Sequence, residues 1–298
     1  MDRDERHAAP LGMDLRMYDD PRAFTALADP FYGTDTLRHT VALTVMARFI
    51  GMRRDKPVLM GTLHDNGELV GVALRTPPWP VIVSGLPTDP GLLDSFLTQW
   101  LEADPELPGV SGPVENAHAV AEAWTRRTGG TTNVTMSSRL FRLDDLMPPA
   151  VPGRARDATL DDLDLLVRWR GDFEIEALGF QRAPEEGPAS VRRMFENRDS
   201  IILWEDRGVP VSWAVASAPI GGMSRVGPVY TPPEHREHGY GSAVTAAVSQ
   251  HAMDAGARDV ILFTDLTNPV SNSIYQKIGY RPVYDATELE FTRLPSTT

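Results

Sequence analysis

Cysteine is absent from this 298-residue sequence. Its absence excludes a disulfide framework, a thiolate metal site and a cysteine nucleophile. The sequence also lacks any run of about 18 apolar residues, the length that a membrane span needs. The charged stretch 1–10 has no apolar region of the kind found in secretory signals. We therefore expect a cytoplasmic protein that does not engage a membrane.

Positive charge is in short supply. The chain has 29 Lys and Arg residues against 41 Asp and Glu residues, which gives a formal net charge of −12. Such an acidic chain repels phosphate backbones at long range, so we expect no nucleic-acid partner. The net charge does not exclude a local pocket for a small anionic ligand.

The length and the prolines together predict two domains. At roughly 100–200 residues per domain, the chain has enough residues for about two, and each is large enough to bury a core. Three prolines and a glycine between Pro148 and Gly153 indicate a stiff, extended linker at 148–153. The linker separates an expected first domain at 13–147 from a second at 154–298.

Apolar periodicity and turn signals in the second domain predict the order β-α-α-β-β-β-α-β-α-β. Thr159 or Asp161 is expected to cap the first helix, and Asn268 the last. The later helices are expected at 191–197, 241–255 and 269–278, and the strands at 154–158, 201–204, 211–218, 225–231, 260–264 and 284–292.

The first domain repeats this order loosely. Its helices are expected at 34–50, 92–103 and 115–128, and its strands at 58–64, 69–75, 81–84, near Val110 and at 132–143. An Asp-Asn-Gly turn at 65–67 is typical of a β-hairpin. We therefore predict two copies of one α/β fold in tandem, similar in the order of their elements and not in their residues.

The segment 226–241 is the richest in chemistry, because it joins a strand to a helix through a glycine-containing loop. Gly239 and Gly241 lack a Cβ, so the backbone can approach a ligand closely there. N–H groups of the loop and the first helical turn have no intrahelical partner, and with the helix dipole they form an anion site suited to a diphosphate. Side chains that add positive charge or a hydroxyl are those of His235, Arg236, His238 and Ser242.

The spacing of this loop differs from two well-known phosphate loops. The dinucleotide pattern G-x-G-x-x-G needs a third glycine, and the P-loop needs Gly-Lys-Ser/Thr. Alone, the pattern R-x-x-G-x-G at 236–241 is a weak signal that favours an ordinary tight turn. A second segment at 268–280, which follows the next strand, makes the pattern more specific.

Together the two segments resemble the GNAT superfamily of N-acetyltransferases. The residues Arg236-x-x-Gly239-x-Gly241 are similar to its phosphate-binding R/Q-x-x-G-x-G/A signature. Asn268, Tyr275 and the ending Ile-Gly-Tyr at 278–280 are similar to its second motif, N…LY…GF. The resemblance implies two tandem GNAT-like domains, each with a mixed, mostly antiparallel sheet that is flanked by helices and splayed between two central strands.

The resemblance also implies the cosubstrate. Acetyl-CoA, or a related acyl-coenzyme A, would bind with its pantetheine arm in the splayed cleft, without a metal ion. An amine would attack the thioester directly, so no acyl-enzyme is needed. The residues expected to contact the coenzyme are Val229, Tyr230, Thr231, Arg236, Glu237, His238, Gly239, Tyr240, Gly241, Ser242 and Asn268.

Three side chains are candidates for the proton transfers. The leaving thiolate needs a proton, and the phenol of Tyr275, with an ordinary pKa of about 10, stays protonated at neutral pH. By resemblance, Tyr275 stands where the family's acid is found. No motif identifies the base, and Asp265 and Glu234 are candidates by position, each just past a central strand. A backbone N–H near Val229 or Tyr230 could stabilise the oxyanion.

Each candidate also has a plainer structural interpretation. Tyr275 can be a core aromatic of an amphipathic helix, and Asn268 a simple N-cap. Asp265 and Glu234 can be solvated carboxylates. We favour the acid role for Tyr275, because it lies off the apolar stripe 270/274/278 of its helix.

The first domain lacks this chemistry. Its strand 81–84 is followed by 85–91 without the pattern R-x-x-G-x-G, and Thr125 stands in the place of the tyrosine. We interpret it as a degenerate copy with a structural role. The acceptor remains open between a small molecule, a peptide N-terminus and a lysine, and the assembly between monomer and homodimer. The alternative function is a non-catalytic acyl-CoA-binding or regulatory module.

Overall fold

The computed structural model describes residues 12–49, 56–179, 181 and 183–294. The stretch 1–10, which bears on the secretory signal, and Ile50, the end of a predicted helix, lie outside the described residues. The chain forms two compact units: unit 1 is Met1–Ser137 with Asp285–Thr298, and unit 2 is Ser138–Tyr284. None of the helices in the described ranges combines the length and apolarity needed to cross a bilayer.

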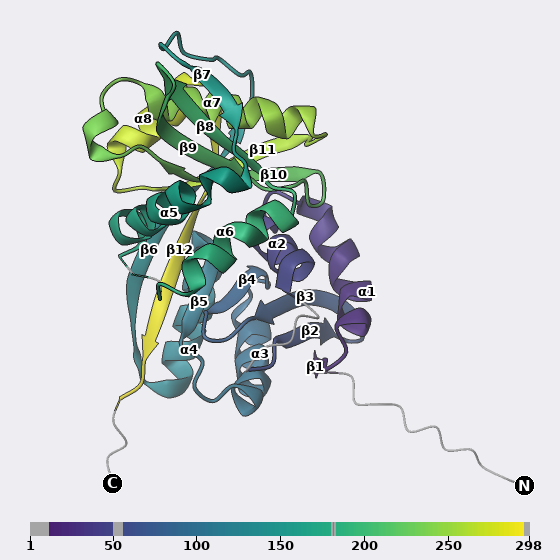
Figure 1. Ribbon diagram of the computed structural model, residues 1–298. Helices are drawn as coiled ribbons and strands as arrows, with labels where there is room; N and C mark the ends of the chain where they lie inside the picture. Colours follow the sequence, from purple (N-terminus) through teal and green to yellow (C-terminus); the bar gives the residue numbers. More distant parts are fainter. Residues whose placement is uncertain (1–11, 50–55, 180, 182, 295–298) are drawn as a thin grey trace, which may run out of the picture. The chain divides into compact units, whose positions relative to one another are not determined.

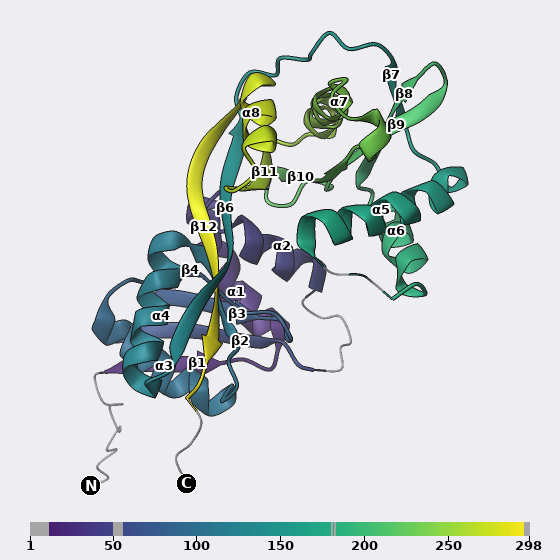
Figure 2. The ribbon, with the colours of Figure 1, turned by 90° about the vertical axis from the view of Figure 1, so that its left-hand side faces the viewer.

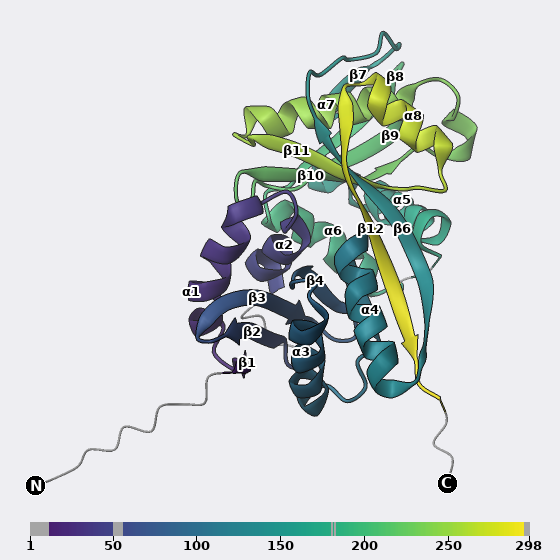
Figure 3. The ribbon, with the colours of Figure 1, turned by 180° about the vertical axis from the view of Figure 1, so that it is seen from behind.

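Unit 1 is a sheet with a pair of helices on each face. Its strand order is β1-β2-β3-β4-β5-β12-β6. Helices α3 and α4 cover one apolar cluster, and α1 and α2 cover another on the opposite face (Figure 3). The elements are β1 (Met13–Met17), α1 (Pro21–Tyr32), the 3-10 turn η1 (Gly33–Asp35), α2 (Thr40–Phe49), β2 (Leu59–Asp65), β3 (Glu68–Arg75), β4 (Val81–Gly85), α3 (Pro90–Ala103), β5 (Gly109–Pro113), α4 (Val114–Thr128) and the first part of β6 (Thr131–Leu143).

Unit 2 repeats this arrangement, with strand order β12-β6-β11-β10-β9-β8-β7 (Figure 1). The remainder of β6 and the first part of β12 also belong to unit 2. The elements of the unit after β6 follow one another from the linker onward. They are β7 (Arg154–Asp157), the 3-10 turn η2 (Leu160–Asp162), α5 (Leu163–Leu178), α6 (Glu186–Glu196), β8 (Ser200–Asp206), β9 (Val209–Ala216), β10 (Met223–Tyr230), the 3-10 turn η3 (Pro233–His235), α7 (Tyr240–Asp254), β11 (Asp259–Asp265), α8 (Pro269–Lys277) and β12 (Tyr280–Thr292).

Alternation along the strands of unit 2 explains why helices cover both faces. Ile202 of β8 packs in the cluster that Val244 and Val248 of α7 also enter. Its neighbours Ile201 and Leu203 pack in a second cluster with residues of α5 and α6. Because successive side chains of a strand point to opposite faces, one apolar strand needs cover on both sides. Figure 2 shows α7 on one side of β8 and β9, and α5 and α6 on the other.

Two long strands, β6 and β12, contribute to both units. Strand β6 passes from unit 1 to unit 2 after Ser137, and β12 returns to unit 1 after Tyr284. The C-terminal part of β12, Ala286–Glu290, pairs antiparallel with β5. The compact units therefore differ from the ranges 13–147 and 154–298, because the end of the chain completes the sheet of unit 1.

The structure confirms the predicted fold class. Each unit has a mixed, mostly antiparallel sheet flanked by helices, and among the described strands only β4–β5 and β10–β11 pair in parallel. Thr159 caps the η2 turn that leads into α5, as its position predicted. Strand β1 and helix α1 had no sequence-based prediction, and α1 contains an internal proline, Pro30.

The shared strands predict where a core substitution acts. Leu289 of β12 is 2% exposed and belongs to the core of unit 1. We expect Leu289→Ala to destabilise unit 1 by about 2–5 kcal/mol, through lost burial and a cavity. Hydrogen exchange followed by mass spectrometry should show faster exchange in β5. The matched variant Leu262→Ala should instead loosen unit 2, and faster exchange confined to unit 2 in Leu289→Ala would contradict this assignment.

Candidate functional site

The sheet of unit 2 opens between its two central strands. Strand β10 pairs with β11 only from Met223–Asp259 to Arg225–Ile261. Beyond that point β10 continues beside β9, with a register shift between Val226 and Val229, whereas β11 continues beside β6 as far as Asp265. The described strands therefore diverge where the sequence predicted a splay, and among them only β9 pairs with the end of β10.

The end of β10 is fixed by side chains from both faces. Val229 packs at the edge of the cluster under α7, and Tyr230 is buried in the cluster under α5 and α6. Ser212 Oγ donates to Tyr230 O at 3.0 Å and lies 2.8 Å from Thr231 Oγ1. These contacts hold the backbone of 229–231, the segment expected to face the pantetheine arm.

The loop after β10 leads into α7 without a side-chain cap. Glu237 and Gly239 have φ values of 66° and 80°, and the N-cap Gly239 has no side chain to accept from the helix. Within the described residues, no hydrogen bond uses the N–H groups of Glu237 to Ser242 as donors; the first helical N–H to find an acceptor is that of Ala243, at 3.0 Å from Gly239 O. The start of α7 thus presents a row of open amides, as the sequence predicted.

The side chains of this loop are used within unit 2. Arg236 donates through Nε to Thr231 O at 2.9 Å and through a terminal nitrogen to Glu176 of α5 at 2.5 Å. His238 lies 2.6 Å from Arg236 O through Nδ1 and stacks on Tyr240. The Tyr240 hydroxyl donates to Asp206 at 2.9 Å. These side-chain contacts hold the loop in place, and none of them uses the backbone N–H groups of Glu237 to Ser242.

Both motif glycines sit where a side chain has little freedom. A Cβ on Gly241 would lie 3.3 Å from Thr231 Oγ1, and Gly239 combines its left-handed φ with a Val151 methyl at 3.0 Å. L-residues pay roughly 1–2 kcal/mol for a left-handed backbone. Ser242 follows, partly exposed, on the first turn of α7. Small residues at these positions keep the loop both bent and accessible.

Tyr275 of α8 lies half-buried beside the cluster under α7, edge-on to Tyr280 at 6.1 Å between ring centroids. Among the described residues, its hydroxyl has no hydrogen-bond partner, whereas the Tyr280 hydroxyl lies 2.7 Å from Ser249 Oγ. Burial raises the pKa of Tyr275 to about 12. The phenol therefore keeps its proton at neutral pH, and none of the described residues accepts a hydrogen bond from it.

The two candidate bases are placed differently. Asp265 ends β11 and accepts from Thr267 N at 2.7 Å and Thr267 Oγ1 at 2.8 Å, so its carboxylate already organises a turn. Asn268 continues that turn: its N–H donates to Asp265 O and its carbonyl accepts from Asn272. Glu234 is exposed on η3. The structure gives neither carboxylate a neighbour that marks it as the base.

The sequence analysis missed a carboxylate that the fold brings to the loop. Glu176 of α5 accepts from the Tyr230 hydroxyl at 3.2 Å as well as from Arg236. Burial, and then the charges of Glu176 and Asp172, raise the pKa of Tyr230 to about 12. No motif marks Glu176, because it lies 54 residues before Tyr230 and meets it only through the packing of α5 on β10.

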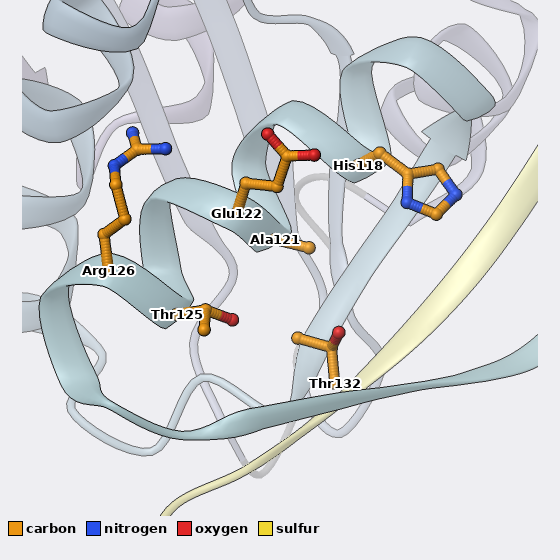
Figure 4. A pocket seen from close by; sticks show the side chains of 6 residues that line it. All are labelled: His118, Ala121, Glu122, Thr125, Arg126 and Thr132. Carbon is orange, nitrogen blue, oxygen red and sulfur yellow. The ribbon is translucent and has the colours of Figure 1, made fainter.

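The corresponding helix start in unit 1 is capped by a carboxylate. After β4, the Asp89 side chain accepts from Leu92 N at 3.0 Å and so caps the start of α3. The carboxylate fills the position that an external anion would take. Unit 1 also carries a shallow hollow of about 380 Å³, along α4 and the start of β6 (Figure 4). The predicted site residues are all elsewhere; the hollow is lined by His118, Ala121, Glu122, Thr125, Arg126 and Thr132.

Part of the chain is similar in sequence to known proteins. Residues 207–289 match the family model described as FR47-like protein. The chain is 28% identical over 145 residues to a mycothiol acetyltransferase of Amycolatopsis mediterranei (strain U-32), and the match covers 44% of each chain. The aligned part thus spans less than half the length of that relative.

The fold of the whole tandem has counterparts among solved structures. An acetyltransferase of the GNAT family from Colwellia psychrerythraea matches 94% of this chain and 100% of its own, with a TM-score of 0.63 and 11% identity. A GCN5-related N-acetyltransferase from Sphaerobacter thermophilus matches 94% of this chain and 95% of its own, with a TM-score of 0.63 and 15% identity. At these identities the similarity concerns the fold.

The environment of Tyr275 predicts its titration. With a pKa near 12, the phenol should stay neutral at pH 11, where an ordinary tyrosine is largely ionised. Since the folded-state pKa is raised, its contribution to stability is complete below pH 10 and is lost as the pH rises towards 12. The tyrosinate absorbance difference between wild type and Tyr275→Phe should therefore have its midpoint near pH 12. A midpoint near 10 would contradict the buried environment.

Proposed function

We propose that this chain is a GNAT-superfamily N-acetyltransferase whose unit 2 transfers an acetyl or related acyl group from acyl-coenzyme A to a primary amine; the similarities to the FR47-like family model, to a mycothiol acetyltransferase and to a GNAT-family fold support this proposal. The acceptor in this proposal is a small molecule or a peptide. Amine attack is direct, so the absence of cysteine from the chain is no obstacle.

The single observation that carries the proposal is the row of open N–H groups from Glu237 to Ser242. Amides at a helix N-terminus favour anions through their direction and through the helix dipole. A diphosphate offers several acceptor oxygens to such a row. The two glycines of the motif leave room for close approach, so the residues present fit the pyrophosphate of coenzyme A.

The contrast with unit 1 supports the assignment to unit 2. Asp89 places its own carboxylate at the start of α3, where α7 has only the bare backbone of Gly239. A carboxylate there repels a phosphate and uses the N–H of Leu92. Thr125 of α4 cannot replace a phenol as a proton donor. We therefore propose that unit 1 is the degenerate copy.

Each chemical step can be assigned to atoms of unit 2. Acetyl-CoA would supply the thioester that the amine attacks. The backbone N–H groups of Val229 or Tyr230, on the open side of β10, would donate to the oxygen that becomes negative. Tyr275 would protonate the leaving thiolate, as its raised pKa keeps the phenol neutral. The amine proton would leave through Glu234, Asp265 or water, and Asn268 would line the coenzyme from the α8 side.

One observation favours a second candidate function, a coenzyme-binding module without catalysis. Neither predicted base is set up for proton transfer, since Glu234 is exposed and the Asp265 carboxylate accepts two bonds from Thr267. Thiol release from acetyl-CoA, measured with an amine panel, separates the two functions. Binding of acetyl-CoA without turnover for any amine, unchanged by Tyr275→Phe, would favour the module.

The loop geometry predicts the effect of a side chain at Gly239. We expect Gly239→Val, or Gly241→Val, to weaken coenzyme A binding by more than about tenfold in calorimetry, because the branched side chain tilts and covers the amides. Gly129→Val is the matched control: Gly129 has φ 71° and ψ 1°, close to the 80° and 5° of Gly239, and no atom within 4 Å of an added Cβ. It carries similar backbone strain at the end of α4 in unit 1. Unchanged affinity in Gly239→Val would exclude this loop as the phosphate site.

The assignment of Tyr275 predicts a separation of binding from turnover. Tyr275→Phe should lower kcat by roughly 100-fold, the usual contribution of a general acid, and leave coenzyme A affinity within about twofold. Tyr280→Phe is the control, because its hydroxyl is committed to Ser249 inside the core. That variant should lose stability and keep its turnover. Parallel loss of kcat and affinity in Tyr275→Phe would indicate a packing role.

A further inference from the structure

The carboxylate of Glu176 joins three elements of unit 2. Its Oε1 accepts from the hydroxyl of Tyr230 at the end of β10, at 3.2 Å. Its Oε2 accepts from a terminal nitrogen of Arg236, in the loop before α7, at 2.5 Å. Through its two oxygens, this one side chain of α5 binds both the end of β10 and the loop before α7.

Arg236 closes the same junction from the loop side. Its Nε donates to Thr231 O at 2.9 Å, which ties residue 236 back to the place where the loop leaves β10. Its guanidinium carbon lies 5.9 Å from the centroid of the Tyr230 ring. One planar guanidinium therefore binds a carbonyl and a carboxylate in two directions, a geometry that the single ammonium of lysine does not reproduce.

The open amides lie directly downstream of this junction. Glu237 and Gly239 have positive φ values, so the chain turns sharply at both residues. The directions of the N–H groups in this turn depend on the contacts that hold the chain before and after it. Downstream, Tyr240 is held by its bond to Asp206 at 2.9 Å. Upstream, the described side-chain contact between the loop and α5 is that of Arg236 with Glu176.

We propose that Glu176 is a positioning residue for the coenzyme: it holds Arg236 against β10 and so fixes the upstream end of the loop whose amides meet the diphosphate. The inference rests on the proposed function of that loop. Arg236 acts through this anchor, and its charge is already paired with Glu176 before any phosphate arrives. The motif arginine thus serves to shape the loop and is not a phosphate ligand.

The exposure of the pair makes this role separable from folding. The Arg236 and Glu176 side chains are 45% and 43% exposed, and ion pairs that open to water contribute little to global stability. Losing the pair should therefore leave the fold intact and free the loop. A loop that must be ordered on binding lowers affinity, because the ordering entropy is then lost at that moment.

A double-mutant cycle on coenzyme A affinity tests the proposal. Glu176→Ala and Arg236→Ala should each weaken binding about three- to tenfold in calorimetry, and the double variant should be no weaker than the worse single variant. Arg236→Lys should be as weak as Arg236→Ala, because it keeps the charge and loses the planar fork. Turnover at saturating acetyl-CoA should stay within about twofold of wild type. Asp164→Ala is the matched control, since it removes an exposed carboxylate from the first turn of α5.

Three outcomes would overturn the proposal. Additive losses in the double variant would mean that the two residues act separately. Full affinity in Arg236→Lys would mean that the charge itself binds the phosphate. Unchanged affinity in Glu176→Ala with a lowered kcat would place Glu176 at the reacting amine.

A second measurement separates this inference from the proposed function. Backbone order parameters of the amides of Glu237 to Gly241, measured by NMR without ligand, should fall in Glu176→Ala and in Arg236→Ala and stay unchanged in Asp164→Ala. If the wild type bound no coenzyme A and these order parameters still fell, the proposed function would fail and the positioning role would stand. If the wild type bound coenzyme A and they did not fall, the positioning role would fail alone.

Discussion

The arrangement of unit 2 depends on the point at which its two parallel strands, β10 and β11, stop pairing. After Arg225 and Ile261, β10 pairs with β9 and β11 pairs with β6. Among the described strands, none therefore pairs with the end of β10 on the side that faced β11. A sheet can tolerate such an opening only if both strands have another partner, since unpaired backbone groups are costly when buried. The neighbours β9 and β6 meet that requirement, and the proposed chemistry is arranged around the resulting gap.

The proposed anion site consists of backbone amides and not of basic side chains. A chain with a net charge of −12 has little long-range attraction for a coenzyme phosphate. Amides at a helix start avoid this difficulty, because they carry partial positive charge and need no counterion. Arg236, the motif's one arginine, is paired with Glu176, so it adds little net charge to the loop.

The two units show how one architecture can carry a capped or an uncapped helix start at corresponding places. Both have a short parallel pair at the centre of the sheet, β4–β5 and β10–β11, followed by a helix. In unit 1 the helix start is occupied by the carboxylate of Asp89, and in unit 2 it is left open by Gly239. The difference lies at single positions, whereas strands β6 and β12 are shared by both units.

The sequence by itself determined most elements of both units and the open loop before α7. These features are written in local patterns: apolar periodicity, glycine spacing and a missing cap residue. Helix α1 escaped prediction because Pro30 interrupts the local pattern, and its position is secured by burial of Phe24, Ala28 and Tyr32. Glu176 escaped prediction because its partners lie 54 and 60 residues further along the chain.

Only the tertiary structure decided three other matters. The end of β12 completes unit 1, and no local signal marks that exchange, because strand pairing depends on which edge is free in the folded sheet. The Asp265 carboxylate proved to be engaged with Thr267, and Arg236 proved to be turned towards α5. A side chain's partner is set by the direction in which its element packs. Sequence spacing therefore gives the candidates for a site, and the packing of distant elements determines which of them meet.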